Sequence, residues 1–321
     1  MTERTDRPIE VTAILTTFAP REELAIVLNE LERLPVDEVI IAVNGPDPDV
    51  GNRDLNVRLI RSGTNLGIMA RNRAAQEAHG EFLLMLDDDS YPLPGAIETL
   101  VGALRADPRL AVAAGLVRDV DLEGGTEKER GSDTFDWWLG GGRSEAEPGT
   151  GMPAFFFAEG ASIVRREAFL EVGGFFEPYF HTNAGLDITT ELIGHGWDVR
   201  YFPSARFVHL KAEAGRDKAA MLRRRIRNQL WYFYRHFPAE VAARRIPAYL
   251  LFDLLESTKS GALRSWPGGI SDAWRDRAAV RGTRRPLPRD VIRRAELNRG
   301  RLHLRLLGNR ALQLVRRSRR T

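Results

Sequence analysis

The sequence feature that most constrains the fold is an apolar run, Phe82 to Leu86, that ends abruptly in three carboxylates, Asp87, Asp88 and Asp89. Five consecutive apolar residues bounded by charge are typical of a strand that is buried on both faces inside a parallel sheet. The acids therefore follow the carboxyl end of the strand. In open α/β sheets, this edge is where ligands bind.

Three adjacent carboxylates repel one another unless a cation joins them. Mg²⁺ and Mn²⁺ favour oxygen ligands, and Mg²⁺ commonly takes one or two carboxylates and completes its shell with substrate phosphates. The pattern therefore predicts a divalent-cation and phosphate site. The alternative is a solvated acidic turn after a core strand, and the three acids by themselves do not decide between the two interpretations.

The segments around this strand alternate between strand and helix patterns. Buried strands are predicted at 10–18, 38–43, 57–60 and 110–117, and helices with one apolar face at 24–31, 65–78 and 95–104. Several strands alternating with helices predict an α/β fold with a Rossmann-like, mostly parallel sheet flanked by helices.

Taken in order, these segments carry motifs that resemble the family 2 inverting glycosyltransferases of GT-A fold. The motifs are Thr16-Thr17-Phe18, Asn44-Gly45, Asn65-x-Gly67-x-x-x-Arg71-Asn72, Gly80-Glu81-Phe82 and Leu86-Asp87-Asp88-Asp89. The family's Asp-x-Asp signature corresponds to Asp87 and Asp89. The resemblance covers about residues 10–240 and implies that a hexosyl or deoxyhexosyl group moves from a nucleoside diphosphate sugar to a hydroxyl acceptor with inversion.

The resemblance also implies roles for particular residues. The sugar nucleotide is expected to contact Thr16, Phe18, Asn44, Asn65, Arg71, Asp87 and Asp88. Asp87 and Asp89 are expected to hold Mn²⁺ or Mg²⁺, and His209, at the end of the last predicted strand, to complete the metal shell. Imidazole suits Mn²⁺ better than Mg²⁺. The alternative for His209 is a structural or solvated histidine.

One departure from the family concerns the nucleobase. Relatives often carry Asp-Asn-Gly-Ser after the second strand, and this chain has Val43 at the Asp position. In some relatives that Asp contacts a uracil. Without it, guanosine and thymidine donors are alternatives to a uridine donor. Asn44 is expected either to turn its amide toward the base or to serve the Asn-Gly turn.

A second departure concerns the catalytic base. Relatives show Glu-Asp-x-Asp before a helix; the first two acids fall on Ala184 and Gly185, and the last on Asp187. An inverting transfer needs a carboxylate that takes the acceptor hydroxyl proton, and Asp187 is the leading candidate. Its alternative role is the N-cap of the helix that follows. Glu159, Asp198 and Glu191 are possible substitutes, and Glu159 and Trp197 are candidates for the acceptor site.

Between the two halves, residues 118–151 are polar and rich in glycine, which is typical of a lid or binding loop. The aromatic residues of 137–138 and 155–157 are more typical of loop anchors than of a sugar-stacking surface. The predicted catalytic domain spans 1–215, with a donor half of about 1–117 and an acceptor half of about 118–215. A helical region with an Arg-rich tail, 216–321, follows.

Charge is distributed unevenly along the chain of 321 residues. Residues 275–321 contain 16 Arg, no Lys and three acids, whereas the rest of the chain is net acidic. Such a tail suits an anionic membrane surface where lipid-linked acceptors reside, and a solvated tail is the alternative. The helices of 219–260 are expected to bind the membrane, to dock onto the catalytic domain or to form a homodimer.

Neither a secretory signal nor a membrane-spanning run is recognisable, and there is no cysteine. We therefore expect a cytoplasmic enzyme, peripheral at the inner face of the cell membrane, that acts in cell-envelope polysaccharide synthesis. Two rival functions remain. A nucleotidyltransferase would need a Gly-rich loop and a Lys after the first strand, and 16–21 has neither. The second is a catalytically degenerate protein that only binds sugar nucleotides, which would explain the absence of acids at 184 and 185. A nucleic-acid-binding function is not supported, because the sequence shows no recognition motif for it.

Overall fold

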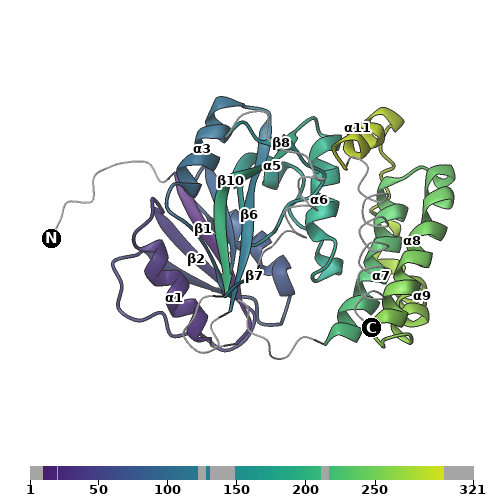
Figure 1. The fold of residues 1–321 in the computed structure, drawn as a ribbon, viewed down its shortest axis with the longest axis horizontal. Helices are drawn as coiled ribbons and strands as arrows, with labels where there is room; N and C mark the ends of the chain where they lie inside the picture. The colour runs from purple at the N-terminus through teal and green to yellow at the C-terminus, as the bar shows by residue number, and fades with distance from the viewer. Residues whose placement is uncertain (1–9, 20, 122–127, 131–148, 211–216, 300–321) are drawn as a thin grey trace, which may run out of the picture.

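The computed structural model describes residues 10–19, 21–121, 128–130, 149–210 and 217–299, and everything stated below concerns these residues. A twisted sheet forms one half of the protein, and a group of helices from the second half of the chain stands beside it (Figure 1). The aromatic pair at 137–138 and the tail from 300 onward lie outside the described residues.

The sheet has the strand order β3-β2-β1-β4-β9-β6-β10-β5, with β7 beside β6 and β8 beside β10. Strands β1 to β4 run parallel, whereas β9 is antiparallel to both β4 and β6, so the sheet is mixed. The strands are β1 (Val11–Thr17), β2 (Glu38–Val43), β3 (Val57–Arg61), β4 (Phe82–Asp87), β5 (Ser90–Pro92), β6 (Leu110–Asp121), β7 (Lys128–Arg130), β8 (Met152–Pro153), β9 (Ala161–Arg165) and β10 (Asp198–Leu210).

Alternate residues of each central strand enter two different cores. In β4, Leu83 and Met85 pack with α2, α5 and α6 on one face, while Phe82, Leu84 and Leu86 pack with α1 and α3 on the other. Because side chains alternate along a strand, a strand that is apolar at every position must be covered on both faces. The sequence prediction of a doubly covered strand before the acids is confirmed.

Helices cover the sheet, and those within 22–31, 67–77 and 96–106 lie where the sequence predicted helices. The helices are α1 (Glu22–Leu31), η1 (Gly67–Ala70), α2 (Arg71–Glu77), α3 (Ala96–Ala106), α5 (Arg166–Glu171), η3 (Glu177–Tyr179) and α6 (Ala184–Gly194). The strand that was predicted to end at His209 is β10, which has a bulge between Phe202 and Arg206. This long strand places His209 at the same sheet edge as the acids of β4.

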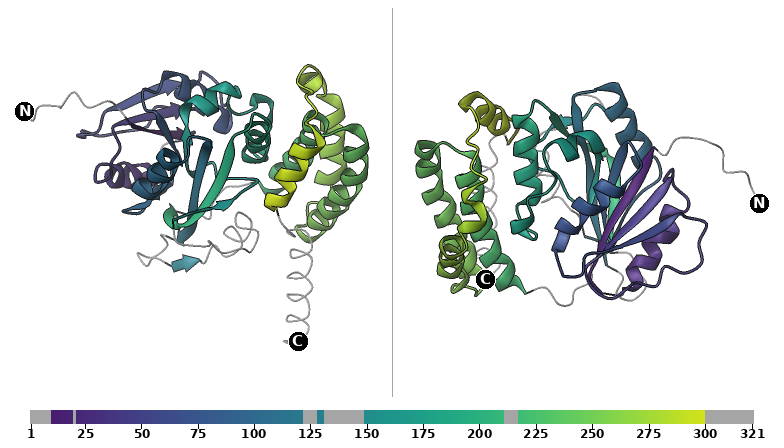
Figure 2. Two further views of the ribbon diagram at one scale, coloured as in Figure 1. Left: turned by 90° about the horizontal axis from the view of Figure 1, so that it is seen from above. Right: turned by 180° about the vertical axis from the view of Figure 1, so that it is seen from behind.

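The C-terminal helices form a layer against α6 (Figure 1 and Figure 2). They are α7 (Lys218–His236), α8 (Ala239–Lys259), α9 (Ser265–Arg275), α10 (Ala278–Arg281) and α11 (Arg289–Arg299). The α7 helix docks onto the catalytic half, because Trp231 stacks with Tyr179 at 6.4 Å and Asn228 donates to the carbonyl oxygens of Tyr179 and Thr182. Docking, one of the alternatives for this region, is therefore confirmed for α7.

The face of α7 predicted from the sequence needs correction. The apolar spacing of Leu222, Ile226, Leu230, Phe233, Tyr234 and Phe237 predicts one buried face, bordered by arginines that include Arg235. In the structure, Tyr234 is 37% exposed, whereas Arg235 is only 6% exposed. The helix is covered on two sides, by the catalytic half and by α8 and α9, so its buried surface is wider than one amphipathic stripe.

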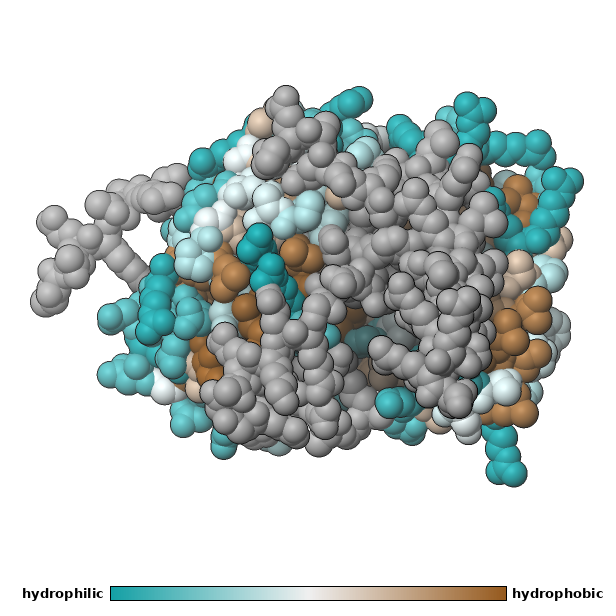
Figure 3. All heavy atoms as spheres, in the orientation of Figure 1, coloured by the Kyte–Doolittle hydropathy of each residue, from teal (hydrophilic) through white to brown (hydrophobic). Residues whose placement is uncertain are grey.

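Exposed apolar residues gather over α8 and α9, at the right edge of the surface view (Figure 3). They are Leu251, Leu255, Leu263 and Trp274. Among the described helices, none is long and apolar enough to cross a membrane.

Candidate active site

The first carboxylate after β4 is held by a buried arginine. Arg71, fully buried at the start of α2, donates at 2.6 Å to Asp87 Oδ1 and at 2.6 Å to the Leu86 carbonyl oxygen; it also donates to the Glu159 carbonyl oxygen at 2.8 Å. Burial alone would raise the pKa of Asp87, but Arg71 outweighs it and holds this pKa below its usual value. Asp87 is therefore an ionised carboxylate held in a fixed orientation.

The next two acids are also buried and share one cation. Arg21 Nη1 lies 3.2 Å from Asp89 Oδ2 and 3.8 Å from Asp88 Oδ1. Burial raises the pKa of Asp88 to about 6; Asp87 and Asp89 add to the rise, and the Thr17 hydroxyl and Arg21 oppose it. Asp88 and Asp89 are thus buried and share the partly exposed Arg21, whereas Asp87 pairs with the buried Arg71.

His209 lies at the same edge because β10 ends there. Its Nδ1 is 2.8 Å from Asp119 Oδ1 and its Nε2 is 3.4 Å from Asp89 Oδ1. Burial lowers the pKa of His209, but Asp119 and Asp89 outweigh it and raise the pKa to about 9. The structure thus brings the three predicted metal ligands, Asp87, Asp89 and His209, to one edge.

These residues fit a hard divalent cation. Asp89 Oδ1 is buried and has no hydrogen-bond partner among the described residues, and an unsatisfied carboxylate oxygen facing an imidazole nitrogen is a donor set that accepts Mn²⁺. Within the described part of the chain, no three His, Asp or Glu side chains already converge as metal ligands do. Binding a metal would therefore require these side chains to reorient.

The residues predicted to surround the nucleobase meet at the ends of β1 and β2. The Asn44 amide donates to the Gly67 carbonyl oxygen at 2.8 Å and accepts from the Leu66 N–H at 3.0 Å. A Cβ on Gly45 would lie 2.0 Å from the Phe18 carbonyl oxygen, so only glycine permits this approach. Phe18 is 58% exposed, which leaves its ring free for stacking.

The remaining predicted donor-site residues lie around this edge. Thr16 pairs in register with Asp87 across β1 and β4. Asn65 accepts from the Gly67 N–H at 2.9 Å, so its side chain shapes the loop before α2. Arg71 donates to Asp87 and to two carbonyl groups, and its contact with the sugar nucleotide stays a prediction.

Asp187, the leading candidate for the base, lies in a closed polar network. Its carboxylate accepts from the Tyr179 hydroxyl at 2.9 Å, contacts His236 Nε2 at 2.7 Å and pairs with Arg235. Burial alone would raise the pKa of Asp187, but His236 and Arg235 outweigh it and hold the pKa below its usual value. Asp187 is 2% exposed. The alternative that Asp187 caps the helix is wrong, because α6 begins at Ala184 with Asn183 as the N-cap.

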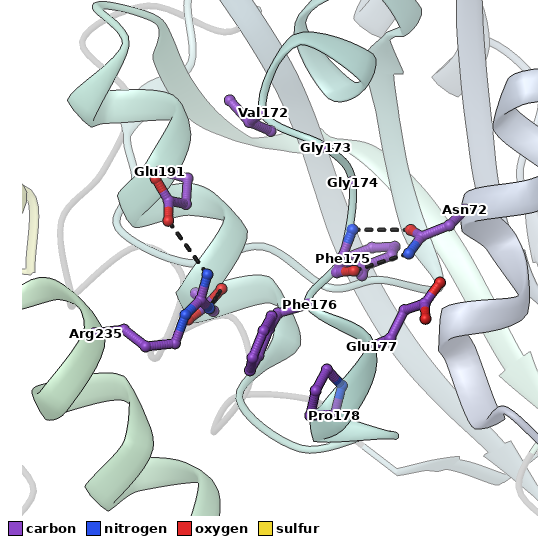
Figure 4. A pocket seen from close by; sticks show the side chains of 11 residues that line it. Asn72, Val172, Gly173, Gly174, Phe175, Phe176, Glu177, Pro178, Glu191 and Arg235 are labelled. Carbon is purple, nitrogen blue, oxygen red and sulfur yellow. Dashed lines mark hydrogen bonds and ion pairs between the residues drawn. The ribbon is translucent and has the colours of Figure 1, made fainter. Parts of the chain in front are cut away.

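A cavity of about 290 Å³ opens beside this network (Figure 4). Its lining includes the glycine turn at 173–174, Phe176, Glu191 and Arg235. Arg235 donates to the Glu191 carboxylate at 3.3 Å (Figure 4). The Asn72 amide forms two hydrogen bonds with the backbone of Phe175, each 2.8 Å long. Asn72, part of the predicted motif, thus fixes the turn that precedes α6.

Glu159 lies between these regions, and Trp197 lies apart from them. The Glu159 carboxylate accepts from the Gly185 N–H at 2.6 Å in the first turn of α6. Trp197 precedes β10, at the opposite end of that strand from His209, and donates to Glu171. Asp198 lies at the same far edge and pairs with Arg109 at 3.5 Å. The structure brings Glu159 to the acid-tipped edge and leaves Trp197 and Asp198 away from it.

Sequence reasoning did not identify four residues that contact the predicted ones. Arg21 and Asp119 hold Asp89 and His209, and Arg235 and His236 hold Asp187. No local pattern marks them, because each partner is at least 48 positions away along the chain.

The fold and this edge define a glycosyltransferase of GT-A type, and comparison with known proteins agrees. The profile of the family described as glycosyl transferase family 2 matches residues 12–173, and this chain belongs to that family. It is similar to the N-acetylglucosaminyl-diphospho-decaprenol L-rhamnosyltransferase of Mycobacterium tuberculosis, with 30% identity over 247 residues, which is 65% of this chain and 79% of the relative.

Two solved structures share the fold. The S. aureus TarS fragment 1–349 in complex with UDP-GlcNAc superposes with a TM-score of 0.55 at 14% identity, over 84% of this chain and 81% of that one. The mannosyltransferase PcManGT from Pyrobaculum calidifontis, in complex with GDP-Man and Mn²⁺, gives a TM-score of 0.51 at 19% identity, over 84% and 76%. The predictions of a family 2 glycosyltransferase with GT-A fold are confirmed.

Proposed function

We propose that this glycosyltransferase is metal-dependent and inverting, and that it moves a hexosyl or deoxyhexosyl group from a nucleoside diphosphate sugar to a hydroxyl of a saccharide or lipid-linked acceptor. The observation that carries the proposal is the cluster of Asp87, Asp89 and His209 at the carboxyl ends of β4 and β10, in which the buried Asp89 Oδ1 accepts no hydrogen bond. Clustered carboxylate oxygens favour a divalent cation and the diphosphate that it binds.

Asp87, Asp89 and His209 would hold Mn²⁺ or Mg²⁺. When bound, the metal neutralises charge on the departing diphosphate. Arg71 keeps Asp87 ionised and oriented, and Asp119 holds the His209 ring through Nδ1 so that Nε2 faces Asp89. Neutral His209 is the ligand form, so metal binding would release the proton that the surrounding carboxylates hold there.

The donor would lie along the ends of β1, β2 and β4. Phe18 offers an exposed ring to the base, and Asn44 and Asn65 shape the loop that borders it. Asp88, beside Thr17, faces the same edge and is available for a ribose hydroxyl. The solved structures hold UDP-GlcNAc and GDP-Man, and the identity of the base in this chain stays open because Val43 replaces the family Asp.

For the acceptor, the M. tuberculosis relative supports a polyprenyl diphosphate saccharide and a role in cell-envelope polysaccharide synthesis. We place the catalytic domain at 1–215 and the helical region at 216–321. A lipid-linked acceptor would bring the enzyme to a membrane surface, and the exposed apolar residues of α8 and α9 support peripheral binding there, at the cytoplasmic face.

The test is thermal unfolding of the full chain with Mn²⁺ and a panel of UDP-, GDP- and dTDP-linked sugars. A donor at about 100 times its Kd should stabilise the wild-type protein by about 2.7 kcal/mol. Asp89→Ala should abolish that stabilisation, while Glu81→Ala, an exposed acid that precedes the same strand, should keep it. Undiminished stabilisation of Asp89→Ala would refute the metal site, as would an equal effect without Mn²⁺.

A further inference from the structure

The backbone around Glu159 is fixed to the donor edge of the site. A Cβ on Gly160 would lie 2.5 Å from Asp87 Oδ2, so the chain passes in direct contact with the first acid. Ser90 Oγ donates to the Gly160 carbonyl oxygen at 2.9 Å, and Arg71 donates to the Glu159 carbonyl oxygen at 2.8 Å. Glu159 is therefore positioned by the same arginine that orients Asp87.

The side chain of Glu159 is anchored at the first turn of α6. Its Oε1 accepts from the Gly185 N–H at 2.6 Å. A Cβ on Gly185 would lie 2.9 Å from that oxygen and 2.6 Å from the Phe157 carbonyl oxygen, so a side chain at 185 and the Glu159 carboxylate exclude each other. Gly185 is one of the two positions where the family resemblance implies an acid, and here the Glu159 carboxylate fills the space beside it.

The other carboxylates near the site are already engaged. Asp87 pairs with Arg71 and Asp89 with Arg21. Asp187 is enclosed by Tyr179, Arg235 and His236, and it points toward α7. Among the described residues, Glu159 forms no ion pair, and its carboxylate accepts hydrogen bonds from backbone N–H groups. The residue as a whole is partly exposed.

The electrostatic surroundings of Glu159 suit proton transfer. Burial raises the pKa of its carboxyl above the usual value, and nearby His181 and Arg71 reduce the rise only in part. A carboxylate with a raised pKa accepts a proton more readily than Asp187, whose pKa is held down by His236 and Arg235. General bases are most effective when their pKa lies near the working pH.

We propose that Glu159, and not Asp187, is the catalytic base of the transfer. In this step the Glu159 carboxylate takes the proton of the acceptor hydroxyl, and the acceptor oxygen forms its bond to the anomeric carbon of the donor. The bond from that carbon to the diphosphate oxygen breaks, and the nucleoside diphosphate leaves with the electron pair. The inference rests on the proposed function, since it needs a donor seated against Asp87.

Two substitutions of Glu159 separate catalysis from a structural role. Glu159→Gln keeps an oxygen that can accept from the Gly185 N–H, so the anchor to α6 remains while the basic group is lost. Glu159→Ala removes both. If Glu159 is the base, both variants should lose about 10²–10⁴-fold in kcat, and Glu159→Gln should keep the wild-type melting temperature and the wild-type stabilisation by donor and Mn²⁺. Glu81→Gln, at the opposite end of β4, is the matched control and should retain full activity.

The assay follows release of the nucleoside diphosphate from the donor that gives the largest thermal stabilisation, with a short-chain polyprenyl diphosphate N-acetylglucosamine as the acceptor probe. Wild-type kcat should rise with pH through the titration of Glu159 and then level, and this limb should be absent from the residual rate of Glu159→Gln. Near-wild-type turnover by Glu159→Gln, with loss only in Glu159→Ala, would overturn the assignment and leave the proposed function intact. A wild-type protein that no donor stabilises would overturn both.

Discussion

Replacement of Asp187 by Asn tests whether the buried network around α6 and α7 holds the protein together. The substitution keeps the shape of the side chain but removes the charge that faces Arg235, which is 6% exposed. Breaking a buried ion pair from one side costs about 3–5 kcal/mol, because the partner charge stays buried without compensation. For a chain of 321 residues that corresponds to a fall in Tm of roughly 4–7 °C.

The pH dependence of this contribution follows from the direction of the pKa shift. Since the pKa of Asp187 is lower in the folded than in the unfolded chain, its stabilisation is fully present above the unfolded pKa, about 3.9, and is lost as the pH falls through the folded value. The difference in Tm between wild type and Asp187→Asn should therefore be constant from about pH 5 to 8 and shrink only at more acidic pH.

Differential scanning calorimetry of both proteins, with kcat measured well below the melting transitions, checks this expectation. Glu240→Gln is the control, because it removes an exposed ion pair with Arg289 and should leave Tm unchanged. If Asp187→Asn kept the wild-type Tm and lost kcat, the structural role would be refuted and Asp187 would return as the base. A lower Tm with kcat preserved in the folded protein supports the network.

Two further expectations concern the donor loop and the C-terminal region. Gly45→Ala should lower Tm and weaken stabilisation by donor, because the added Cβ meets the Phe18 carbonyl oxygen at 2.0 Å. Gly102→Ala on α3 has open space around the added Cβ and should raise stability by up to about 1 kcal/mol. Equal donor binding by Gly45→Ala would contradict a nucleobase site at this loop. Removal of 300–321 should weaken flotation with anionic liposomes, because it takes away arginines of the tail, and equal flotation would rule out membrane binding through the tail. Removal of all of 275–321 should instead destabilise the protein, since Val280 and Ile292 are buried in the core.

Much of the catalytic half followed from local patterns. The run Phe82–Leu86 is fully buried, as its uninterrupted apolar composition predicted, and β2 spans the predicted 38–43. Strand β9 shows where such reasoning ends. Its apolar residues are compatible with a strand, but its antiparallel position between β4 and β6 depends on strands that are distant in the sequence. Pairing direction is a property of the assembled sheet.

The α7 helix illustrates the same limit. Its apolar periodicity predicted one buried face, yet Arg235 and His236 are buried as well, because Asp187 and Glu191 of α6 compensate their charge and polarity. A buried arginine is stable only with its partner in place. Since that partner is 48 positions away, no window of the sequence contains the information.

The sequence by itself determined the acid-tipped strand, the edge at which Asp87 and Asp89 lie, and the family to which the chain belongs. These features are encoded in short-range periodicity and in motifs that are read along the chain. The tertiary structure decided which carboxylate is engaged and which is open: it enclosed Asp187 between α6 and α7 and set Glu159 between Asp87 and the first turn of α6. The physical reason is that the basicity of a carboxylate depends on its burial and its partners, and folding alone brings these together.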